Sequence, residues 1–343
     1  MNDVDILVIG AGPAGLAAAA AAGTRASVLV ADEHGAPGGQ LRKQIHKFFG
    51  SSRHFAGKRG FAIAWELEAQ ARAAGAEFAL NTVVYSLQPD LTASLAGPDD
   101  TRHVRAQRVI LATGASENAV AFPGWTLPGV MTAGAAQTLV NLHRVLPGRR
   151  GLIVGSGNVG LVVGFQLAQA GADLAALVEI RPQVGGYSVH AGKLRRTGVP
   201  ILTSSLLTRA GGAGRVQSAV IARCGADGQP LAATERAFAV DFICLAAGLH
   251  PASELARMAG CDCRGDTPIH SPELETTVPG LYVAGDAAGV EEASSAMEEG
   301  KLAATHALVS LGRLDKRLGL KDMAACRDVL AQLRGERRLE AGA

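Results

Sequence analysis

The sequence predicts an α/β protein made of two lobes, each built around a parallel sheet, and three observations support this fold class. The chain has 343 residues, which allows two cores at roughly 150 residues per domain. A glycine-rich turn between an apolar strand and an apolar helix occurs twice, near residue 10 and near residue 155. Glycine also makes up 43 of the 343 residues, well above an average usage of roughly 7%, as expected of a chain with many tight turns.

The first glycine turn follows the first predicted strand. The apolar run at 5–9 predicts that strand, and the alanine-rich run ending at residue 22 predicts a helix. The sequence between them is GAGPAG. In such a turn the first glycine permits the bend, the second lets the backbone approach a pyrophosphate, and the third lets the helix pack on the strand. The candidate binding residues of this turn are Gly10, Gly12, Pro13, Ala14 and Gly15.

An acidic residue follows this turn at about the spacing of a dinucleotide fingerprint. The run at 27–31 predicts a second strand, which ends at Asp32 and Glu33. A carboxylate at this place can accept hydrogen bonds from ribose hydroxyls. Both acids are candidates, and Asp32 is slightly favoured because it is the last residue of the strand.

The same pattern recurs in the middle of the chain. Strands are predicted at 151–154 and 174–178, with an amphipathic helix at 161–170 and the turn GSGNVG before it. The candidate residues here are Gly155, Gly157, Asn158, Val159, Gly160 and Glu179. The recurrence predicts two Rossmann-like dinucleotide-binding domains.

The acid of the second fingerprint indicates which nucleotide it would hold. Glu179 would repel the extra phosphate of NADP and bond a free 2′-hydroxyl, which favours NAD. Arg181 could offset this preference by contacting the phosphate. A vacant second site, or one that holds another adenine nucleotide, also remains open.

A third segment completes the first lobe. Residues 280–284 (GLYVA) predict a buried strand that runs into Gly285 and Asp286, and a helix is predicted at about 294–308. A carboxylate at this junction suits a sugar-like polyol.

These motifs together resemble the two-dinucleotide flavoprotein family typified by glutathione and thioredoxin reductases. The matching segments are GAGPAG, ATG at 112–114, the second GxGxxG and VAGDAAG at 283–289, in the family's order over residues 1 to about 310. The resemblance implies FAD at the first turn, with Asp286 on the ribitol, and NAD(P) at the second. It also implies FAD contacts at Gly39, Gln40, Val84, Ala112, Thr113, Gly114, Gly285 and Ala296.

The same resemblance implies how the chain is divided and which relatives it has. The FAD domain is expected at 1–115 and 243–320, the inserted NAD(P) domain at 116–242, and a C-terminal helical tail at 321–343. The tail is amphipathic and is expected to pack on its own protein or on a partner. Residues 122–139 are similar to the FAD subunits of opine oxidase, hydrogen cyanide synthase, hydroxyproline dehydrogenase and sarcosine oxidase.

The cysteines depart from the dithiol reductases of that family. Those enzymes carry a cysteine pair close to the flavin, whereas the first cysteine here is Cys224, so thiol-disulfide reduction is disfavoured. Cys261 and Cys263 are interpreted as incidental loop residues, and no metal site is predicted. Opine oxidase-type subunits commonly continue into a cysteine-rich iron-sulfur segment. Only Cys326 follows Asp286, so most ligands of any cluster would come from another polypeptide.

The charge and the hydropathy of the sequence argue against two classes of protein, nucleic-acid binders and membrane-spanning proteins. The formal net charge is +2 and no basic tract stands apart, which argues against a nucleic-acid binder. No apolar run near the N-terminus approaches the roughly 20 residues of a membrane span, so a cytoplasmic protein is expected. The segment 42–59 is locally basic. A solvated face is favoured there over a role for Lys43 or His46 beside the flavin.

We therefore predict an FAD-dependent oxidoreductase that moves hydride or electrons between FAD and a nicotinamide or a partner subunit. It would belong to an amino-acid or opine-type dehydrogenase complex that also contains a second flavoprotein and a small iron-sulfur protein, act on a small-molecule substrate and form an oligomer. One alternative is a stand-alone NADH-dependent reductase of a quinone, ferredoxin or flavin. Another is a nucleotide-binding scaffold without redox turnover. No catalytic residue is identified from the sequence.

Overall fold

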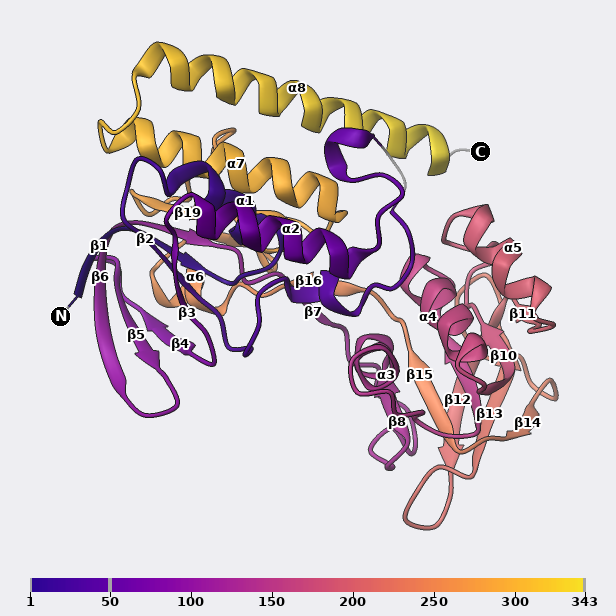
Figure 1. Ribbon diagram of the computed structural model, residues 1–343. Helices are drawn as coiled ribbons and strands as arrows, with labels where there is room; N and C mark the ends of the chain where they lie inside the picture. The colour runs from indigo at the N-terminus through magenta and orange to yellow at the C-terminus, as the bar shows by residue number, and fades with distance from the viewer. Residues whose placement is uncertain (1, 49–50, 342–343) are drawn as a thin grey trace. The chain divides into compact units, whose positions relative to one another are not determined.

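A computed structural model describes residues 2–48 and 51–341 (Figure 1). The chain divides into two compact units. Unit 1 comprises Met1–Ser116 and His250–Ala343, and unit 2 comprises Glu117–Leu249. The connecting segments β7 (Ala115–Glu117) and β16 (Leu249–Pro251) pair with each other in a two-stranded sheet.

Unit 1 is built on a seven-stranded sheet. Its order is β3 (Glu77–Ala79), β2 (Val28–Ala31), β1 (Asn2–Ile9), β6 (Thr101–Leu111), β5 (Thr92–Ala96) and β4 (Val83–Leu87), with β19 (Leu281–Val283) also paired to β6. Strands β1, β6 and β19 are parallel, and their registers align Ile9 and Val283 with Leu111. The carboxyl ends of these three strands therefore meet at one edge, where ligands bind in open α/β sheets.

Helices cover this sheet. They are α1 (Pro13–Ala22), α2 (Gly60–Ala73), α6 (Glu254–Met258), α7 (Ala293–Ser310) and α8 (Lys316–Ala341), with 3₁₀ helices at Gly39–Lys43, Ser52–His54 and Gly285–Ala287 and a hairpin of β17 (Cys263–Arg264) and β18 (Thr267–Pro268). The alanine-rich α1 is apolar on all sides because it is buried in the same core as α7. Helix α8 runs alongside α7 (Figure 1).

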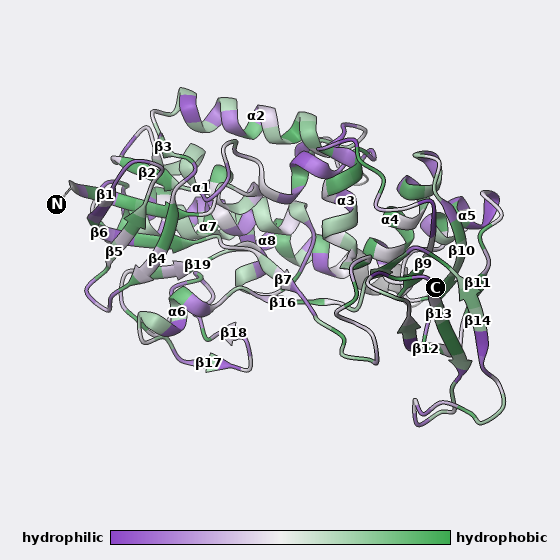
Figure 2. Ribbon diagram, turned by 90° about the horizontal axis from the view of Figure 1, so that it is seen from below, coloured by the Kyte–Doolittle hydropathy of each residue, from purple (hydrophilic) through white to green (hydrophobic). Residues whose placement is uncertain are grey.

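Unit 2 repeats the parallel arrangement on a smaller scale. Its main sheet has the order β11 (Ile201–Leu202), β10 (Asp173–Val178), β9 (Arg150–Val154), β15 (Phe242–Leu245) and β8 (Val130–Thr132). Its remaining elements are the antiparallel strands β12 (Ser205–Gly211), β13 (Ser218–Arg223) and β14 (Arg236–Ala239), and helices α3 (Ala133–Asn141), α4 (Asn158–Gln169) and α5 (Ser188–Arg196). The central strands of both units are hydrophobic, as buried parallel strands should be (Figure 2).

Two predicted boundaries need correction. The predicted return to the first domain at residue 243 is wrong, because β15 is a fully buried strand between β9 and β8 and the chain leaves unit 2 only after Leu249. The C-terminal helix predicted at 321–343 begins earlier than residue 321, and it packs on its own protein, one of the two expected possibilities. Helix α8 begins at Lys316 and buries Met323 and Leu330 in the core of unit 1, while residues 342–343 lie outside the described residues.

Within the described part of the chain, no helix combines the length and apolar character needed to cross a membrane. The same residues contain no group of three or more His, Cys, Asp or Glu side chains arranged to hold a metal ion.

Candidate functional site

The turn between β1 and α1 has the geometry that its glycines predict. Gly10 has φ +103°, and a Cβ on it would lie 2.3 Å from Ala112 O. A Cβ on Gly15 would lie 1.9 Å from Gly10 O. Gly12 differs, since no described atom lies within 4 Å of where its Cβ would be. The first and third glycines are thus required by the fold, whereas the second faces open space at the start of α1.

Asp32 faces this turn. Its Oδ2 accepts a hydrogen bond from Ala11 N at 2.6 Å and its Oδ1 accepts one from His34 N at 2.8 Å. The Glu33 side chain is 67% exposed, and its Oε1 lies 3.9 Å from His34 Nδ1. Of the two candidate acids, Asp32 contacts the turn, whereas Glu33, two residues beyond the end of β2, has an exposed side chain.

A second loop lies against the glycine turn. Gly38 N donates to Ala11 O at 2.7 Å, and a Cβ on Gly39 would lie 2.9 Å from Gly12 Cα. Gln40, the next residue, is exposed. This loop therefore brings the predicted residue Gly39 against the backbone of Gly12, with Gln40 next to it in the chain.

Other predicted residues line the same edge of the sheet. Ala112 N donates to Ile9 O at 2.8 Å, and Thr113 Oγ1 donates to Ala252 O at 2.7 Å. Gly114 follows with φ +76°. Val84 lies on β4. Two residues earlier, Thr82 N donates to the backbone oxygen of Asp32 at 2.9 Å, so the start of β4 adjoins Asp32.

The Gly285–Asp286 turn, about 270 residues away in the sequence, lies next to α1. Gly285 has φ +70°, and a Cβ on it would lie 2.9 Å from the Ala14 Cβ and 3.3 Å from the Ala296 Cβ. Asp286 Oδ1 accepts a hydrogen bond from Glu291 N at 3.0 Å. The structure thus brings the predicted residues of both segments together at one edge of unit 1.

These features fit a flavin dinucleotide. The N-terminus of α1 has no side-chain cap, so its N–H groups and the open space at Gly12 suit a pyrophosphate. Asp32 contacts the turn itself, and Asp286 follows Gly285, which packs on Ala14; carboxylates in these segments suit the hydroxyl groups of a ribose and of a ribitol.

The turn between β9 and α4 in unit 2 has matching geometry. A Cβ on Gly155 would lie 2.2 Å from Ala246 O, and one on Gly160 would lie 2.1 Å from Gly155 O. Gly157 has no described atom within 4 Å of its Cβ position. Val159 is 41% exposed on the first turn of α4. The second glycine again faces open space at a helix without a side-chain cap.

Glu179 is held more tightly than Asp32. Its Oε2 accepts from Ser156 N at 2.8 Å and Ser156 Oγ at 2.6 Å, and its Oε1 accepts from Arg181 N at 2.9 Å and Arg181 Nε at 3.1 Å. The side chain is buried. Burial alone would raise the pKa of Glu179, but these hydrogen bonds outweigh it and lower the pKa.

Unit 2 also has a paired-glycine loop that the sequence motifs did not reveal. Gly186 N donates to Ser156 O at 2.8 Å, as Gly38 N donates to Ala11 O in unit 1. Gly185 N donates to Ser156 Oγ at 2.9 Å, and Tyr187 N donates to Asn158 Oδ1 at 2.9 Å. The signal was present in the sequence, because a GG pair begins six residues after the strand-end acid in both units.

Two adjacent glutamates on α7 were also missed. Glu298 is fully buried, and its Oε1 contacts His54 Nε2 at 3.1 Å and Lys301 Nζ at 2.9 Å. Burial alone would raise the pKa of Glu298, but these partners lower it to about 2. His54 is only 2% exposed, so the solvated-face interpretation of the basic segment is wrong for this residue. The two glutamates lie inside α7, and nothing in the local sequence pattern indicated their burial, because charged residues are usually exposed.

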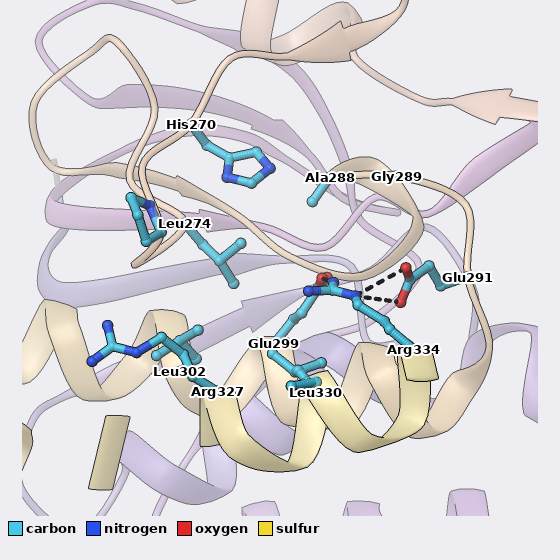
Figure 3. A pocket seen from close by; sticks show the side chains of 12 residues that line it. His270, Leu274, Ala288, Gly289, Glu291, Glu299, Leu302, Arg327, Leu330 and Arg334 are labelled. Atoms are coloured by element: carbon cyan, nitrogen blue, oxygen red, sulfur yellow. Dashed lines mark hydrogen bonds and ion pairs between the residues drawn. The ribbon is translucent and has the colours of Figure 1, made fainter. Parts of the chain in front are cut away.

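Glu299 faces the Gly285–Asp286 turn. Its Oε2 accepts from Gly285 N at 2.8 Å, and its Oε1 accepts from Arg334 Nη2 at 2.5 Å. Burial raises the pKa of Glu299 to about 7, although the charge of Arg334 opposes the rise. Glu299 lines a cavity of about 470 Å³ between α7, α8 and the segment before α7 (Figure 3).

Known proteins resemble this chain over most of its length. Residues 4–300 match the family model of the pyridine nucleotide-disulphide oxidoreductases. The chain is 33% identical over 341 residues to an opine oxidase subunit of Rhizobium meliloti (strain 1021), covering 90% of this chain and 72% of that protein. It is 30% identical over 329 residues to the alpha subunit of sarcosine oxidase from Corynebacterium sp. (strain P-1), covering 90% of this chain and 33% of that protein. The structure of T. acidophilum thioredoxin reductase matches with a TM-score of 0.75 at 21% identity, over 91% of this chain and 99% of that one, and so shares its fold.

The chain is thus an oxidoreductase with a two-domain, thioredoxin reductase-like α/β fold. It belongs to the pyridine nucleotide-disulphide oxidoreductase family, whose members depend on FAD. The predicted family, fold class and enzyme class are confirmed. The chain spans only part of the curated relatives, from 63% to 72% of three opine oxidase subunits and about a third of the alpha subunit of sarcosine oxidase.

Proposed function

We propose that this chain holds FAD in unit 1 and exchanges hydride or electrons with a nicotinamide or a partner subunit, as one subunit of an amino-acid or opine-type dehydrogenase complex. The observation that carries the proposal is the contact of the Gly285–Asp286 turn with Ala14 in the first glycine turn. This contact supports the proposal because it joins the segment of Asp286 to the turn that Asp32 contacts.

Different residues of unit 1 would bind different parts of the cofactor. The N–H groups at the start of α1 and the open face of Gly12 would hold the pyrophosphate, Asp32 the ribose and Asp286 the ribitol. Helix α7 begins at Ala293, and its N-terminal N–H groups, near Ala296, would stabilise negative charge on the flavin pyrimidine. FAD, when bound, supplies the hydride and one-electron chemistry.

The cysteines support this proposal over disulfide reduction. The first 223 residues contain no cysteine, so neither of the family's dithiol positions is filled. Cys244 and Cys261 are buried, and burial raises the pKa of both thiols, which leaves little thiolate to attack a disulfide. The similarity to the opine oxidase subunit favours oxidation of an amino-acid-like small molecule instead.

For the second site we propose NAD in preference to NADP. Glu179 is a charged acid at the end of β10, and Arg181, which could have contacted a 2′-phosphate, has its Nε bonded to Glu179. Titration with NADH and NADPH tests this proposal. Tighter binding of NADH supports it, and tighter binding of NADPH contradicts it.

A second candidate function is a stand-alone NADH-dependent reductase of a quinone, ferredoxin or flavin, and the close match between the two glycine turns favours it. Adding NADH to the isolated chain without oxygen separates the two. Rapid bleaching of the flavin supports the stand-alone reductase. Bleaching only in the presence of a partner and an amino acid supports the complex.

The proposed partners are a second flavoprotein and a small iron-sulfur protein, in an oligomer located in the cytoplasm. Purification from native extract tests them. Co-elution of such proteins with this chain supports the complex, whereas elution of the chain alone with full activity contradicts it.

A further inference from the structure

The C-terminal helix α8 places an arginine between two glutamates beside the Gly285–Asp286 turn. Arg334 Nη2 donates to Glu299 Oε1 at 2.5 Å, and Arg334 Nε donates to the two carboxylate oxygens of Glu291 at 3.1 and 3.2 Å. Figure 3 shows the guanidinium reaching from α8 to both side chains. One side chain of α8 therefore links two acids that come from α7 and from the loop before it.

Each of these acids is bonded to one residue of the turn. Glu299 Oε2 accepts from Gly285 N at 2.8 Å, and Glu291 N donates to Asp286 Oδ1 at 3.0 Å. The hydrogen bonds therefore form a closed circuit that runs from Gly285 through Glu299, Arg334 and Glu291 to Asp286.

The charge of Arg334 matters because Glu299 is only 5% exposed. A buried carboxylate without a cation is costly and tends to take up a proton. The carboxylate of Glu291 lies near Glu299 and, because it carries the same charge, raises the pKa of Glu299. Arg334 opposes this rise in the pKa of Glu299 and so favours the ionised carboxylate, which is the stronger acceptor for Gly285 N.

Helix α8 is held in place without Arg334. Its apolar face buries Met323, Cys326 and Leu330 in the core of unit 1. Arg327, two turns earlier, lines the same cavity and donates to Glu273 Oε1 at 2.7 Å, but Glu273 is not part of the circuit. Arg334 lies outside residues 4–300, the segment that matches the family model.

We propose that Arg334 is a positioning residue for FAD, which fixes the Gly285–Asp286 turn through Glu299 and Glu291 and thereby couples α8 to the affinity for the cofactor. This inference rests on the proposed function, because Asp286 must be the ribitol ligand. Any change that moves α8 alters FAD binding.

The test is FAD titration of the apoprotein, followed by flavin fluorescence, for Arg334→Gln, Arg334→Lys and the matched control Arg327→Gln. Arg334→Gln should weaken FAD binding about tenfold, since hydrogen bonds to charged groups are lost. Arg334→Lys should restore part of the affinity, and Arg327→Gln should stay within about twofold of the wild type. Thermal midpoints of the apoproteins should be similar for the two glutamine variants.

A double-variant cycle sharpens the test. Glu299→Gln combined with Arg334→Gln should bind FAD no more weakly than the weaker single variant, because both changes break one circuit. Additive losses, or equal affinities for Arg334→Gln and Arg327→Gln, would overturn the proposal. Asp286→Ala separates this failure from failure of the proposed function. If Asp286→Ala keeps full FAD affinity, the cofactor site itself is wrong. If it loses FAD while Arg334→Gln does not, only the role of Arg334 is wrong.

Discussion

The glycine turns of units 1 and 2 have matching backbones but different surroundings. In both, the first glycine packs on a carbonyl of a neighbouring strand end, Ala112 O or Ala246 O, and the second faces open space. In unit 2 the strand-end acid, Glu179, is bonded by a serine hydroxyl and an arginine. In unit 1 the position that corresponds to Ser156 is Ala11, which has no hydroxyl. The unit 1 turn is contacted instead by a distant segment, the Gly285–Asp286 turn, which packs on Ala14.

This difference shows that one local motif can be completed in two ways. In unit 2 the hydrogen bonds that hold the strand-end acid and the paired-glycine loop to the turn all lie within residues 155–187. Unit 1 completes its turn with α7 and α8, from the other end of the chain, and buries two glutamates in doing so. We therefore expect unit 1 to carry the stronger dependence on charge, and unit 2 to be affected mainly by changes in its own turn.

The largest expected effect is on stability and comes from Glu298 on α7. Its pKa of about 2 lies below the ordinary value of 4.5, so it contributes stability that is present above pH 4.5 and is lost as the pH falls toward 2. Glu298→Gln should lower the unfolding free energy by about 3 kcal/mol at neutral pH. Urea denaturation from pH 2 to 7 measures this, with Glu292→Gln, an exposed residue at the start of the same helix, as the control. An unchanged midpoint at pH 7 would show that the His54 and Lys301 contacts contribute nothing.

Glu299 should show the opposite pH dependence. Its pKa of about 7 lies above the ordinary value of 4.5, so the folded state binds the extra proton between these two values and stability falls as the pH rises through them. This group alone should lower the unfolding free energy by about 3 kcal/mol between pH 4.5 and 7. Glu299→Gln should flatten that part of the pH profile. A profile as steep as that of the wild type would rule out a raised pKa.

A smaller effect is expected from substituting the second glycine of each turn, and these substitutions test whether the two nucleotide sites are independent. Gly12→Ala and Gly157→Ala each add a Cβ to open space, so neither should change the stability of the apoprotein. Gly12→Ala should weaken FAD binding roughly thirtyfold, or about 2 kcal/mol, because the Cβ meets the pyrophosphate. Gly157→Ala should leave FAD in place and weaken nicotinamide nucleotide binding. Calorimetric titration of both ligands measures this, and loss of FAD from both variants would contradict two separate sites.

The smallest expected effect comes from a substitution that makes the unit 2 turn resemble the unit 1 turn, where alanine stands in place of Ser156. Ser156→Ala removes the hydroxyl that donates to Glu179 and accepts from Gly185 N. It should lower stability by about 1 kcal/mol and raise the pKa of Glu179, without changing FAD affinity. Chemical denaturation followed in parallel with flavin fluorescence measures both. A change in FAD affinity would show that the two turns are not independent.

The sequence predicted those parts of the site that depend on short-range patterns. The glycine turns, Asp32, Glu179 and the Gly285–Asp286 turn each follow an apolar strand at a fixed spacing, and strand ends in a parallel sheet meet at one edge. The domain boundary at Leu249 was missed because β15 is apolar on both faces and would suit either sheet.

The contacts that were missed join residues far apart in the sequence. His54 and Glu298 are separated by 244 positions, and Arg334 and Glu299 lie on different helices. A charged residue is usually exposed, so neither pattern indicated burial. Only the packing of α7 between α1 and α8 buries these carboxylates, and the sequence of one segment does not encode that packing.

The central claim is that the first glycine turn and Asp286 hold one FAD. The most direct measurement is the FAD stoichiometry and affinity of apoprotein carrying Asp286→Ala, beside the wild type and Asp262→Ala, an exposed aspartate on the surface of the same unit. We predict one FAD for each wild-type and Asp262→Ala chain, and affinity at least tenfold weaker for Asp286→Ala. Full flavin occupancy at unchanged affinity in Asp286→Ala would contradict the claim.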